Sequence, residues 1–337
     1  MKKQKRKTSP ARAAMKMLCT FLGVVFIVML GATLYFQHLL GGINYVDAED
    51  TTLLSQEELN DLLDIPAISI DMDLFDDHST QIGGRGSDII NILLIGQDRR
   101  EGEDRARSDS MILCTFNKNT KQITMTSFLR DLYVEIPGYS NNRINAAYAA
   151  GGMSLLNETL EENFGLYIDG NVEVDFAQFA EIVDLLGGVE IELRQDEANV
   201  VNEETGSSLG AGIQKLNGDQ ALAYARIRKL DADGDFSRTN RQRTVLNAMV
   251  EAYKGTKLTT VLSLVSEILP MITTDMSNGK ILTLALELFP LLSGAEIVSQ
   301  RVPADGTYTN QMISGMSVLV ADMDAARQML EETLTGN

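Results

Sequence analysis

Charged and apolar positions divide the chain sharply near its N-terminus. Residues 1–16 carry seven positive charges and no negative charge, and residues 17–40 contain no charged side chain. An apolar run of that length can cross a bilayer as a helix. Because the positive charges precede the run, we expect a cytoplasmic basic tail, one transmembrane helix over residues 17–40 and the remainder outside the cell. A cleaved signal peptide is the alternative, but the run is longer than usual and no small-x-small site ends it.

The next segment, residues 41–88, is strongly acidic, with twelve acids and one base. This composition predicts an extracellular stalk that separates the following domain from the membrane. One short helix is expected at Gln56–Leu63, because Ser55 and Glu58 have the spacing of a capping box. Apolar residues between positions 65 and 70 are also able to pack on the domain.

The remaining residues, 89–335, alternate between apolar, β-branched runs and longer amphipathic runs, which predicts one folded extracellular domain. Strands are expected at residues 91–96, 110–117, 122–129, 189–193 and 297–302. Helices are expected at residues 152–163, 176–186, 258–269, 280–292 and 320–332. Strands this apolar are typical of a sheet covered on both faces. The order predicts an α/β fold, a three-layer α-β-α sandwich with a central mixed sheet.

The overall charge limits the class of ligand. The formal net charge is −18, and without the seven cations of the tail 22 bases remain against 47 acids, so the exported part carries −25. A surface this acidic does not attract nucleic acid, which excludes that class of partner. Cys19 and Cys114 fall in the apolar run and in an expected strand, so they predict neither a disulfide nor a metal site. The exported part therefore depends on its own core, for which 44% apolar residues suffice.

One short segment is positively charged, in contrast to the negative charge of the whole chain. Residues 224–243 contain five arginines and one lysine. Arginine guanidinium groups bind phosphate oxygens through two parallel hydrogen bonds, so the segment predicts a polyanionic ligand. Arg226 and Arg228 flank Ile227, and in the extended form that we expect here both arginines point to one side and the isoleucine to the other.

A helix is expected to follow this pair, capped by Ser237 and ending near Tyr253. On its first turns Arg238, Arg241 and Gln242 share one face, where the helix dipole also favours an anion. A basic helix face paired with nearby acids is the alternative interpretation, which the five arginines in this arrangement make less favourable.

A second group of charged residues lies at the ends of the expected strands. Asp98 follows the first strand, Arg107 and Asp109 precede the second, and Arg130 and Asp131 end the third. If the second strand returns beside the first, the two carboxylates of Asp98 and Asp109 meet at one end of the sheet. Two carboxylates alone make a weak Mg²⁺ site, because Mg²⁺ keeps water ligands and takes others from phosphates. Taken singly, each residue is better explained by a solvated loop charge, or for Arg130 and Asp131 by a local ion pair.

Several short segments form a specific pattern in their order and spacing. They are Asn-Ile-Leu-Leu-Ile-Gly-Gln-Asp at 91–98, Arg-Ser-Asp-Ser-Met at 107–111, Phe-Leu-Arg-Asp-Leu-Tyr-Val-Glu-Ile-Pro at 128–137, Arg-Ile-Asn-Ala-Ala-Tyr-Ala-Ala-Gly-Gly at 143–152, Val-Asp-Phe at 174–176, Leu-Leu-Gly-Gly-Val at 185–189, Ala-Leu-Ala-Tyr-Ala-Arg-Ile-Arg at 221–228 and Ser-Arg-Thr-Asn-Arg-Gln-Arg at 237–243. The chain resembles the LytR–CpsA–Psr family of cell-envelope proteins, with a motif core over residues 91–250. Ser108 and Arg143 stand where threonine and lysine are common, and these mild departures put nothing central in doubt.

The resemblance implies a Mg²⁺-dependent phosphotransferase outside the membrane of a Gram-positive-type envelope. It would move an anionic glycopolymer, such as teichoic acid or capsular polysaccharide, from a polyprenyl-pyrophosphate carrier to peptidoglycan. By position in the family's motifs, Asp98 and Asp109 would bind Mg²⁺. The residues that would bind the pyrophosphate are Arg107, Arg130, Arg226, Arg228, Arg238 and Gln242. The catalytic candidates are Arg130, Asp131 and Asp98, and the base is Asp98, Asp109 or Asp131.

These residue types suit the implied reaction, because attack at a phosphoryl group needs positioning and charge neutralisation more than a covalent nucleophile. The carrier lipid also needs an apolar trench, for which the helices at 258–269 and 280–292 are candidates. Plain core packing is the favoured interpretation of these two helices.

Two other functions stay open at this point. One is a pyrophosphatase that uses water as the acceptor, and the other is a non-enzymatic regulator of envelope genes, a transcriptional attenuator. The regulator fits poorly, because only about sixteen residues are expected in the cytoplasm and they hold no DNA-reading fold. The sequence does not determine the polymer, the acceptor or the oligomeric state.

Overall fold

The computed structural model describes residues 44–47, 53–63, 81–84, 87–97, 108–231 and 234–336. They lie in a compact unit that extends from Asn44 to Asn337. The tail and the membrane span expected over residues 1–40 fall outside the described residues. Within the described part of the chain, no helix combines the length and the hydropathy needed to cross a bilayer.

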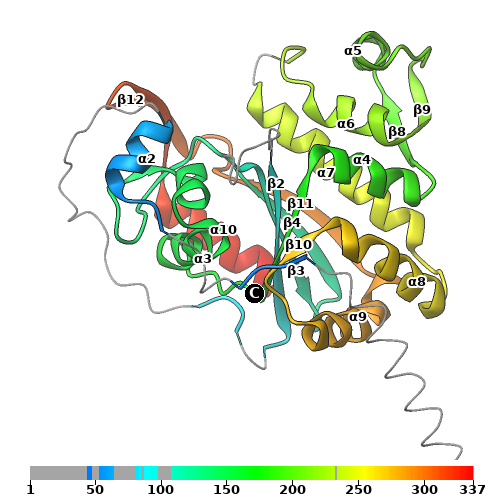
Figure 1. Cartoon of the computed structure of the whole chain (residues 1–337), viewed down its shortest axis with the longest axis horizontal. Coiled ribbons are helices and arrows are strands. Elements are labelled where there is room, and N and C mark those ends of the chain that lie inside the picture. The colour runs from blue at the N-terminus through cyan, green and yellow to red at the C-terminus, as the bar shows by residue number, and fades with distance from the viewer. Residues whose placement is uncertain are drawn as a thin grey trace, which may run out of the picture. The chain divides into compact units, whose positions relative to one another are not determined.

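A mixed sheet of seven strands forms the centre of this unit (Figure 1), in the order β1-β10-β7-β2-β3-β4-β11. The strands are β1 (Asn44–Tyr45), β2 (Ile89–Gln97), β3 (Ser108–Asn117), β4 (Gln122–Phe128), β7 (Gly170–Asp175), β10 (Thr273–Thr274) and β11 (Glu296–Val302). Consecutive strands β2, β3 and β4 pair antiparallel, whereas β7 is parallel to β2 and β11 is parallel to β4. The predicted α/β fold with a central mixed sheet is confirmed.

Helices cover both faces of this sheet. On one side lie α2 (Gln56–Leu63), α3 (Ile144–Phe164) and α10 (Met323–Thr335), and on the other lie α4 (Phe176–Leu185), α6 (Gly218–Arg226) and α7 (Asp235–Tyr253) (Figure 1). Successive side chains of β2 divide between the two layers, as the period of a strand requires. Leu93 and Ile95 belong to the core shared with α3 and α10, whereas Leu94 packs with Leu246 of α7.

A smaller core lies beyond α4, α6 and α7. It contains α5 (Gln195–Thr205) and the hairpin of β8 (Val189–Leu193) and β9 (Gly212–Leu216). The strand expected at 189–193 is therefore present, but it pairs in this hairpin rather than in the central sheet. Its buried and exposed residues alternate strictly, which is typical of an antiparallel pair with one face in water.

The C-terminal part differs from expectation in one element. Residues Tyr308–Ile313 (β12) and Met316–Ala321 (β13) form a hairpin, so the helix expected from residue 320 begins only at Met323. Asp322 is its cap, because the side chain accepts a hydrogen bond of 3.0 Å from the Ala325 backbone nitrogen. The remaining elements are β5 (Tyr133–Val134), β6 (Asn142–Arg143), α8 (Leu258–Ile268), the 3₁₀ turn η2 (Leu269–Met271) and α9 (Asn278–Leu292).

Helix α3 consists of two helical segments joined by a kink. Gly151 and Gly152 have non-helical backbone angles, and Gly152 has φ 63° and ψ −148°, a conformation open to glycine. The helix expected at 152–163 corresponds to the second segment. The first segment, from Ile144 to Ala150, was not predicted because its run of small residues lacks an amphipathic period.

The described parts of the acidic segment 41–88 belong to the folded unit. Strand β1 pairs with β10, and α2 has the predicted capping box, with 2.8 Å from the Ser55 backbone nitrogen to Glu58 and 3.2 Å from the Glu58 backbone nitrogen to Ser55. Leu59 on α2 is fully buried in the core beneath α3. A buried leucine and a paired strand tie these parts of the expected stalk to the domain.

The burial of Leu59 gives a test of this packing. Leu59→Ala is expected to lower the free energy of unfolding by about 2–5 kcal/mol, because it leaves a cavity in the core. Leu62→Ala on the same helix removes a side chain that is 46% exposed and is expected to cost less than about 0.5 kcal/mol. Denaturant unfolding of the full chain in detergent measures both. Equal effects of the two substitutions would show that α2 is not part of the core.

Candidate active site

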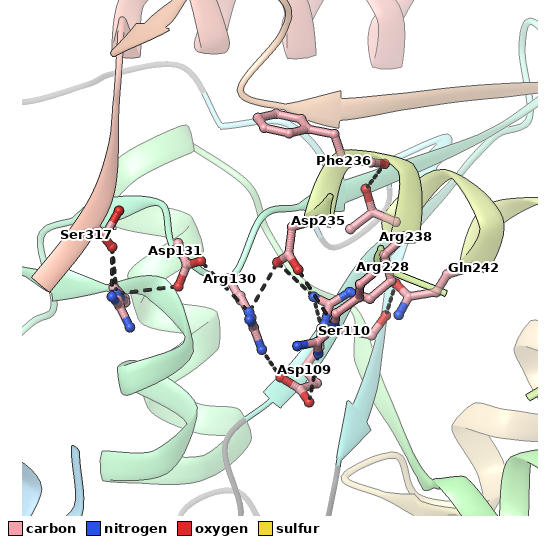
Figure 2. Close-up of polar contacts among 12 residues, drawn as sticks. Asp109, Ser110, Arg130, Asp131, Arg228, Asp235, Phe236, Arg238, Gln242 and Ser317 are labelled. Atoms are coloured by element: carbon pink, nitrogen blue, oxygen red, sulfur yellow. Dashed lines mark hydrogen bonds and ion pairs between the residues drawn. The ribbon is translucent and has the colours of Figure 1, made fainter. Parts of the chain in front are cut away.

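Arginines and acids from five separate parts of the chain line one cavity of about 570 Å³. The start of β3 contributes Asp109, and the loop after β4 contributes Arg130. Helix α5 contributes the acids Glu203 and Glu204. The end of α6 contributes Arg226, the segment after it Arg228, and α7 Arg238. Ser110 and Gln242 also line it, and the Ser110 hydroxyl donates a hydrogen bond of 3.1 Å to Gln242 Oε1. Figure 2 shows Asp109, Arg130, Arg228, Arg238 and Gln242 converging. The structure thus gathers five predicted pyrophosphate-binding residues, with Asp109, around one space.

Arg130 is fixed between two carboxylates. Its Nη1 donates to Asp109 Oδ1 at 2.6 Å, and its Nε lies 3.1 Å from Asp235 Oδ2 (Figure 2). Burial by itself lowers the pKa of this guanidinium, but the charges of Asp235, Asp109 and Asp131 outweigh burial and raise it. Arg130 is therefore a permanent, rigidly held cation.

Asp235 joins three of the arginines. Its Oδ2 lies 2.9 Å from Arg238 Nη2 and 3.1 Å from Arg130 Nε, and its Oδ1 lies 4.0 Å from Arg228 Nε. Asp235 was not among the predicted site residues, because it precedes Ser237, the expected cap of the helix. Helix α7 in fact begins at Asp235 rather than at Ser237. The signal in the sequence was the spacing of three between Asp235 and Arg238, which puts them on one helix face.

Arg238 is almost fully enclosed, with 2% of its surface exposed. Burial lowers its pKa to about 10, with Arg130 and Arg228 adding to the effect and Asp235 opposing it. Its Nη2 donates to the Asp109 carbonyl oxygen at 3.2 Å, whereas its Nε has no hydrogen-bond partner among the described residues. A buried unpaired donor beside several cations is suited to an anionic oxygen.

Arg226 and Arg228 lie on the same side of their segment, as predicted. Both are exposed and line the cavity, whereas Ile227 between them is 4% exposed. The expectation that the whole pair is extended was wrong, because α6 continues through Arg226 and the extended backbone begins at Ile227, with φ −58° and ψ 124°. The guanidinium of Arg226 lies 4.7 Å from the ring centroid of Phe176, a cation–π contact.

Arg241 does not share the face of Arg238 and Gln242, contrary to expectation. It is buried, donates to Glu197 Oε1 at 2.8 Å and to the Ile227 carbonyl oxygen at 3.2 Å, and pairs with Asp231. For this residue the alternative interpretation, an arginine paired with nearby acids, is the correct one. Its contact with Ile227 fixes the segment that presents Arg226 and Arg228.

Asp131 lies beside the cavity rather than among the described residues that line it. Its carboxylate is 3.4 Å from Arg143 Nε and 3.9 Å from Arg130 Nε, and its carbonyl oxygen accepts from the Leu319 backbone nitrogen at 2.9 Å. Arg143 in turn donates to the Ser317 carbonyl oxygen at 2.7 Å (Figure 2). The β12–β13 hairpin therefore braces the loop that carries Arg130.

Two predicted site residues, Asp98 and Arg107, fall outside the described residues. Asp98 is the next residue after Gln97, which pairs with Ser108 in the β2–β3 ladder. Asp109 follows Ser108, and its carboxylate is 20% exposed at the cavity wall. Within the described residues, no group of three or more histidine, cysteine or acidic side chains has a geometry suited to a metal ion.

An apolar cavity of about 280 Å³ adjoins the polar one. It lies between the sheet and helices α4, α6 and α7, and Leu94, Ile112, Val174, Phe179 and Leu246 are among its lining residues. Ser110, Phe176, Arg226 and Gln242 line both cavities. The lipid trench expected from the helices at 258–269 and 280–292 is thus formed mainly by other elements: α8 contributes Ile268, and no described lining residue comes from α9.

The fold and site define an α/β protein in which an arginine-lined cavity shares wall residues with an apolar cavity. Residues 64–335 match the LytR_cpsA_psr family, and the chain belongs to it.

Proteins similar to this chain include named transferases and a named regulator. It is 38% identical over 175 residues to the polyisoprenyl-teichoic acid–peptidoglycan teichoic acid transferase TagU of Bacillus licheniformis, covering 52% of this chain and 55% of that protein. It is 33% identical over 222 residues to the regulatory protein MsrR of Staphylococcus aureus, covering 65% of this chain and 66% of that protein. The chain thus spans about half to two thirds of the length of the curated relatives it matches.

The fold is similar to that of Bacillus subtilis YwtF (TagT), solved with bound octaprenyl pyrophosphate lipid. The TM-score is 0.58 at 28% identity, covering 75% of this chain and 93% of that chain.

The burial of Arg238 predicts a pH-dependent defect in Arg238→Lys. A free lysine has a pKa of about 10.4, and the burial and neighbouring arginines that lower the pKa of Arg238 would lower that of the lysine toward neutrality. Its charge would be present at low pH and lost as pH rises. We expect the ratio of pyrophosphate dissociation constants, variant to wild type, to grow with pH in calorimetric titrations. Arg228→Lys is the control, since Arg228 is 43% exposed, and its ratio should stay flat. A flat ratio for Arg238→Lys as well would contradict the prediction.

Proposed function

We propose that this chain is a membrane-anchored phosphotransferase that moves an anionic glycopolymer from a polyprenyl-pyrophosphate carrier to peptidoglycan. The observation that carries this proposal is the shared wall between the arginine-lined cavity and the apolar cavity. A lipid pyrophosphate has a doubly charged head on a hydrocarbon chain, and it matches both cavities at once. The transferase TagU and the lipid bound to YwtF support this substrate class.

The arginines suit transfer of a phosphoryl group. An acceptor hydroxyl oxygen attacks the phosphorus that carries the glycan, a new P–O bond forms, and the bond to the leaving polyprenyl phosphate breaks. Charge that develops on the phosphate oxygens is stabilised by Arg130, Arg226, Arg228 and Arg238. Because Asp109 and Asp235 hold Arg130 in place before the ligand arrives, little reorganisation is needed during the reaction.

A base must take the proton of the acceptor hydroxyl, and Asp98, Asp109 and Asp131 are the candidates. Both carboxylates that the structure describes pair with an arginine, but Asp109 lines the cavity and Asp131 does not. The geometry therefore favours Asp109 over Asp131 for contact with the reacting groups. Asp131 fits better as a residue that positions the Arg130 loop.

Asp98 and Asp109 would hold Mg²⁺. Asp109 fits this role, because a carboxylate oxygen at the cavity wall is the ligand type that Mg²⁺ prefers, and Mg²⁺ takes its other ligands from water and phosphate. When bound, the cation supplies neutralisation of charge on the pyrophosphate.

Anchoring and location follow from the uncharged run over residues 17–40 and the basic residues before it. We place the N-terminus in the cytoplasm and the domain outside the cell membrane. A pyrophosphate-linked donor is already activated, so the reaction needs no nucleotide there.

A regulatory role is the alternative that the similarity to the regulatory protein MsrR supports. The buried, unpaired Nε of Arg238 and the converging arginines favour a protein that binds a phosphorylated ligand and acts on it.

An in vitro transfer assay tests the proposal. It combines the full chain with a lipid-linked oligosaccharide pyrophosphate, Mg²⁺ and peptidoglycan. A phosphodiester between the oligosaccharide and peptidoglycan, detected by mass spectrometry after muramidase digestion, would support transfer. Accumulation of free phosphorylated oligosaccharide instead would indicate a pyrophosphatase, and no turnover of the donor would overturn the enzymatic proposal.

Removing one arginine from the cavity should abolish this transfer without unfolding the domain. Arg130→Ala and Arg228→Ala are each expected to lower kcat/KM by about 10²–10³, the usual cost of losing one preorganised donor to developing charge. The control is Lys215→Ala, which removes an exposed cation of β9 outside the cavity and should leave kcat/KM unchanged. Thermal unfolding of all three variants checks the fold. Wild-type activity in both arginine variants would contradict the assignment of this cavity as the active site.

Metal dependence gives a separate measurement. Chelation by EDTA is expected to stop transfer, and added Mg²⁺ to restore it. Asp109→Asn keeps the shape but removes a charged ligand, so half-maximal activity should need at least about tenfold more Mg²⁺, roughly 1.4 kcal/mol in binding. An unchanged Mg²⁺ requirement in Asp109→Asn would remove this residue from the metal site.

A further inference from the structure

Helices α8 and α9 are rich in apolar residues that the fold does not bury. None of the eleven residues of α8 is buried, although five of its apolar side chains are leucine or valine. In α9 the described buried residues are Ile281 and Leu291, and Leu286 is 48% exposed. Helices of this composition are normally enclosed by a core or by lipid, so their partial exposure needs an explanation.

These helices lie at the end of the sheet opposite the arginines. Strand β3 begins at the polar cavity with Asp109 and ends at Asn117, and Lys118 in the following turn lies 3.5 Å from Glu287 of α9. Ile268 at the end of α8 and Ile272 after η2 line the apolar cavity. The apolar cavity therefore leads from the arginines toward the α8–η2 surface.

The described chain begins at this end of the domain. Strand β1 pairs with β10, and Asn44 Nδ2 donates to the Pro270 carbonyl oxygen in η2 at 3.4 Å. The predicted membrane span ends at residue 40, four residues before Asn44. Four extended residues reach at most about 14 Å, so if the run spans the bilayer, the η2–β10 end lies close to its surface.

The same surface carries little of the negative charge of the domain. Residues 258–292 contain three acids, Glu267, Asp275 and Glu287, and one base. Glu287 pairs with Lys118, and Asp275 accepts hydrogen bonds from Asn171. An apolar surface with most of its acids already engaged is compatible with a phospholipid surface, which the rest of this strongly acidic domain is not.

We propose that α8 and α9 rest on the outer leaflet of the bilayer and place the mouth of the apolar cavity at the lipid surface. A carrier lipid would then enter the domain from the membrane with its hydrocarbon chain leaving lipid for protein, without crossing water. The occupant of this surface is the phospholipid bilayer. The proposal rests on the membrane anchoring put forward above and extends it to how the substrate arrives.

Tryptophan fluorescence tests the contact directly, because the chain contains no tryptophan. Leu286→Trp on α9 and Ile213→Trp on β9, where the native side chain is 73% exposed, are each prepared in the full chain and placed in nanodiscs of ordinary or brominated phosphatidylcholine. Bromine on the acyl chains quenches emission on contact. We expect brominated lipid to lower the emission of Leu286→Trp at least twofold and to leave that of Ile213→Trp unchanged. Equal emission of Leu286→Trp in both lipids would overturn the proposal, and Leu262→Trp on α8 repeats the test should Leu286→Trp unfold.

A second experiment compares transfer from a bilayer-embedded donor with transfer from a soluble donor. It distinguishes failure of the membrane contact from failure of the proposed transferase function. Leu286→Glu and Leu262→Glu place charge on the surface and are expected to lower transfer from a bilayer-embedded donor at least about tenfold, while leaving transfer from a short-chain donor in detergent unchanged. An equal loss with both donors would show damage to the site and count against the docking role. Quenching of Leu286→Trp together with no transfer by wild type from either donor would overturn the transferase assignment and leave the membrane contact standing.

Discussion

The fixation of Arg130 between Asp109 and Asp235 is the contact on which the site depends. It joins the start of β3, the loop after β4 and the start of α7, three parts of the chain that no local interaction holds together. Arg228 and Arg238 approach the same two acids. Without these carboxylates the arginines would repel one another in a half-buried space. With them, the cluster keeps a positive excess that an anionic ligand can neutralise.

The arginine cluster lies at one end of the sheet, so the polar cavity lies at that end and the apolar cavity extends away from it. The polar and apolar cavities share four wall residues, namely Ser110, Phe176, Arg226 and Gln242. Within this wall the guanidinium of Arg226 packs on the ring of Phe176. The apolar cavity continues toward α8 and η2, near the strand where the chain emerges from its N-terminal part. A molecule with a charged head and a hydrocarbon tail therefore has one orientation in the domain, with its head beside the arginines.

Local sequence pattern correctly predicted the strands and helices whose structure does not depend on contacts with distant parts of the chain. The strands at 91–96, 110–117 and 122–129 were correct to within two residues, because continuous apolar runs between polar turns leave few alternatives. The strand at 189–193 was also correct, yet its pairing with β9 was not foreseen, because strand pairing depends on residues distant in the chain. The first half of α3 was missed for a related reason. Its small residues are buried by contact with the rest of the core rather than marked by a period of their own.

The sequence by itself determined which residue types carry the chemistry, the reversal of sign over residues 224–243 and the opposite directions of Ile227 and its two flanking arginines. Only the tertiary structure decided which arginines face the cavity and which are structural. Arg241 lies one residue from Gln242, but Glu197 and Asp231 bury it, while Gln242 meets Ser110 in the cavity. Asp235 likewise gained its role from Arg130, more than one hundred positions away. The physical reason is that local spacing fixes only the side of an element on which a charge lies. The energy of a half-buried charge depends on its partners across the fold.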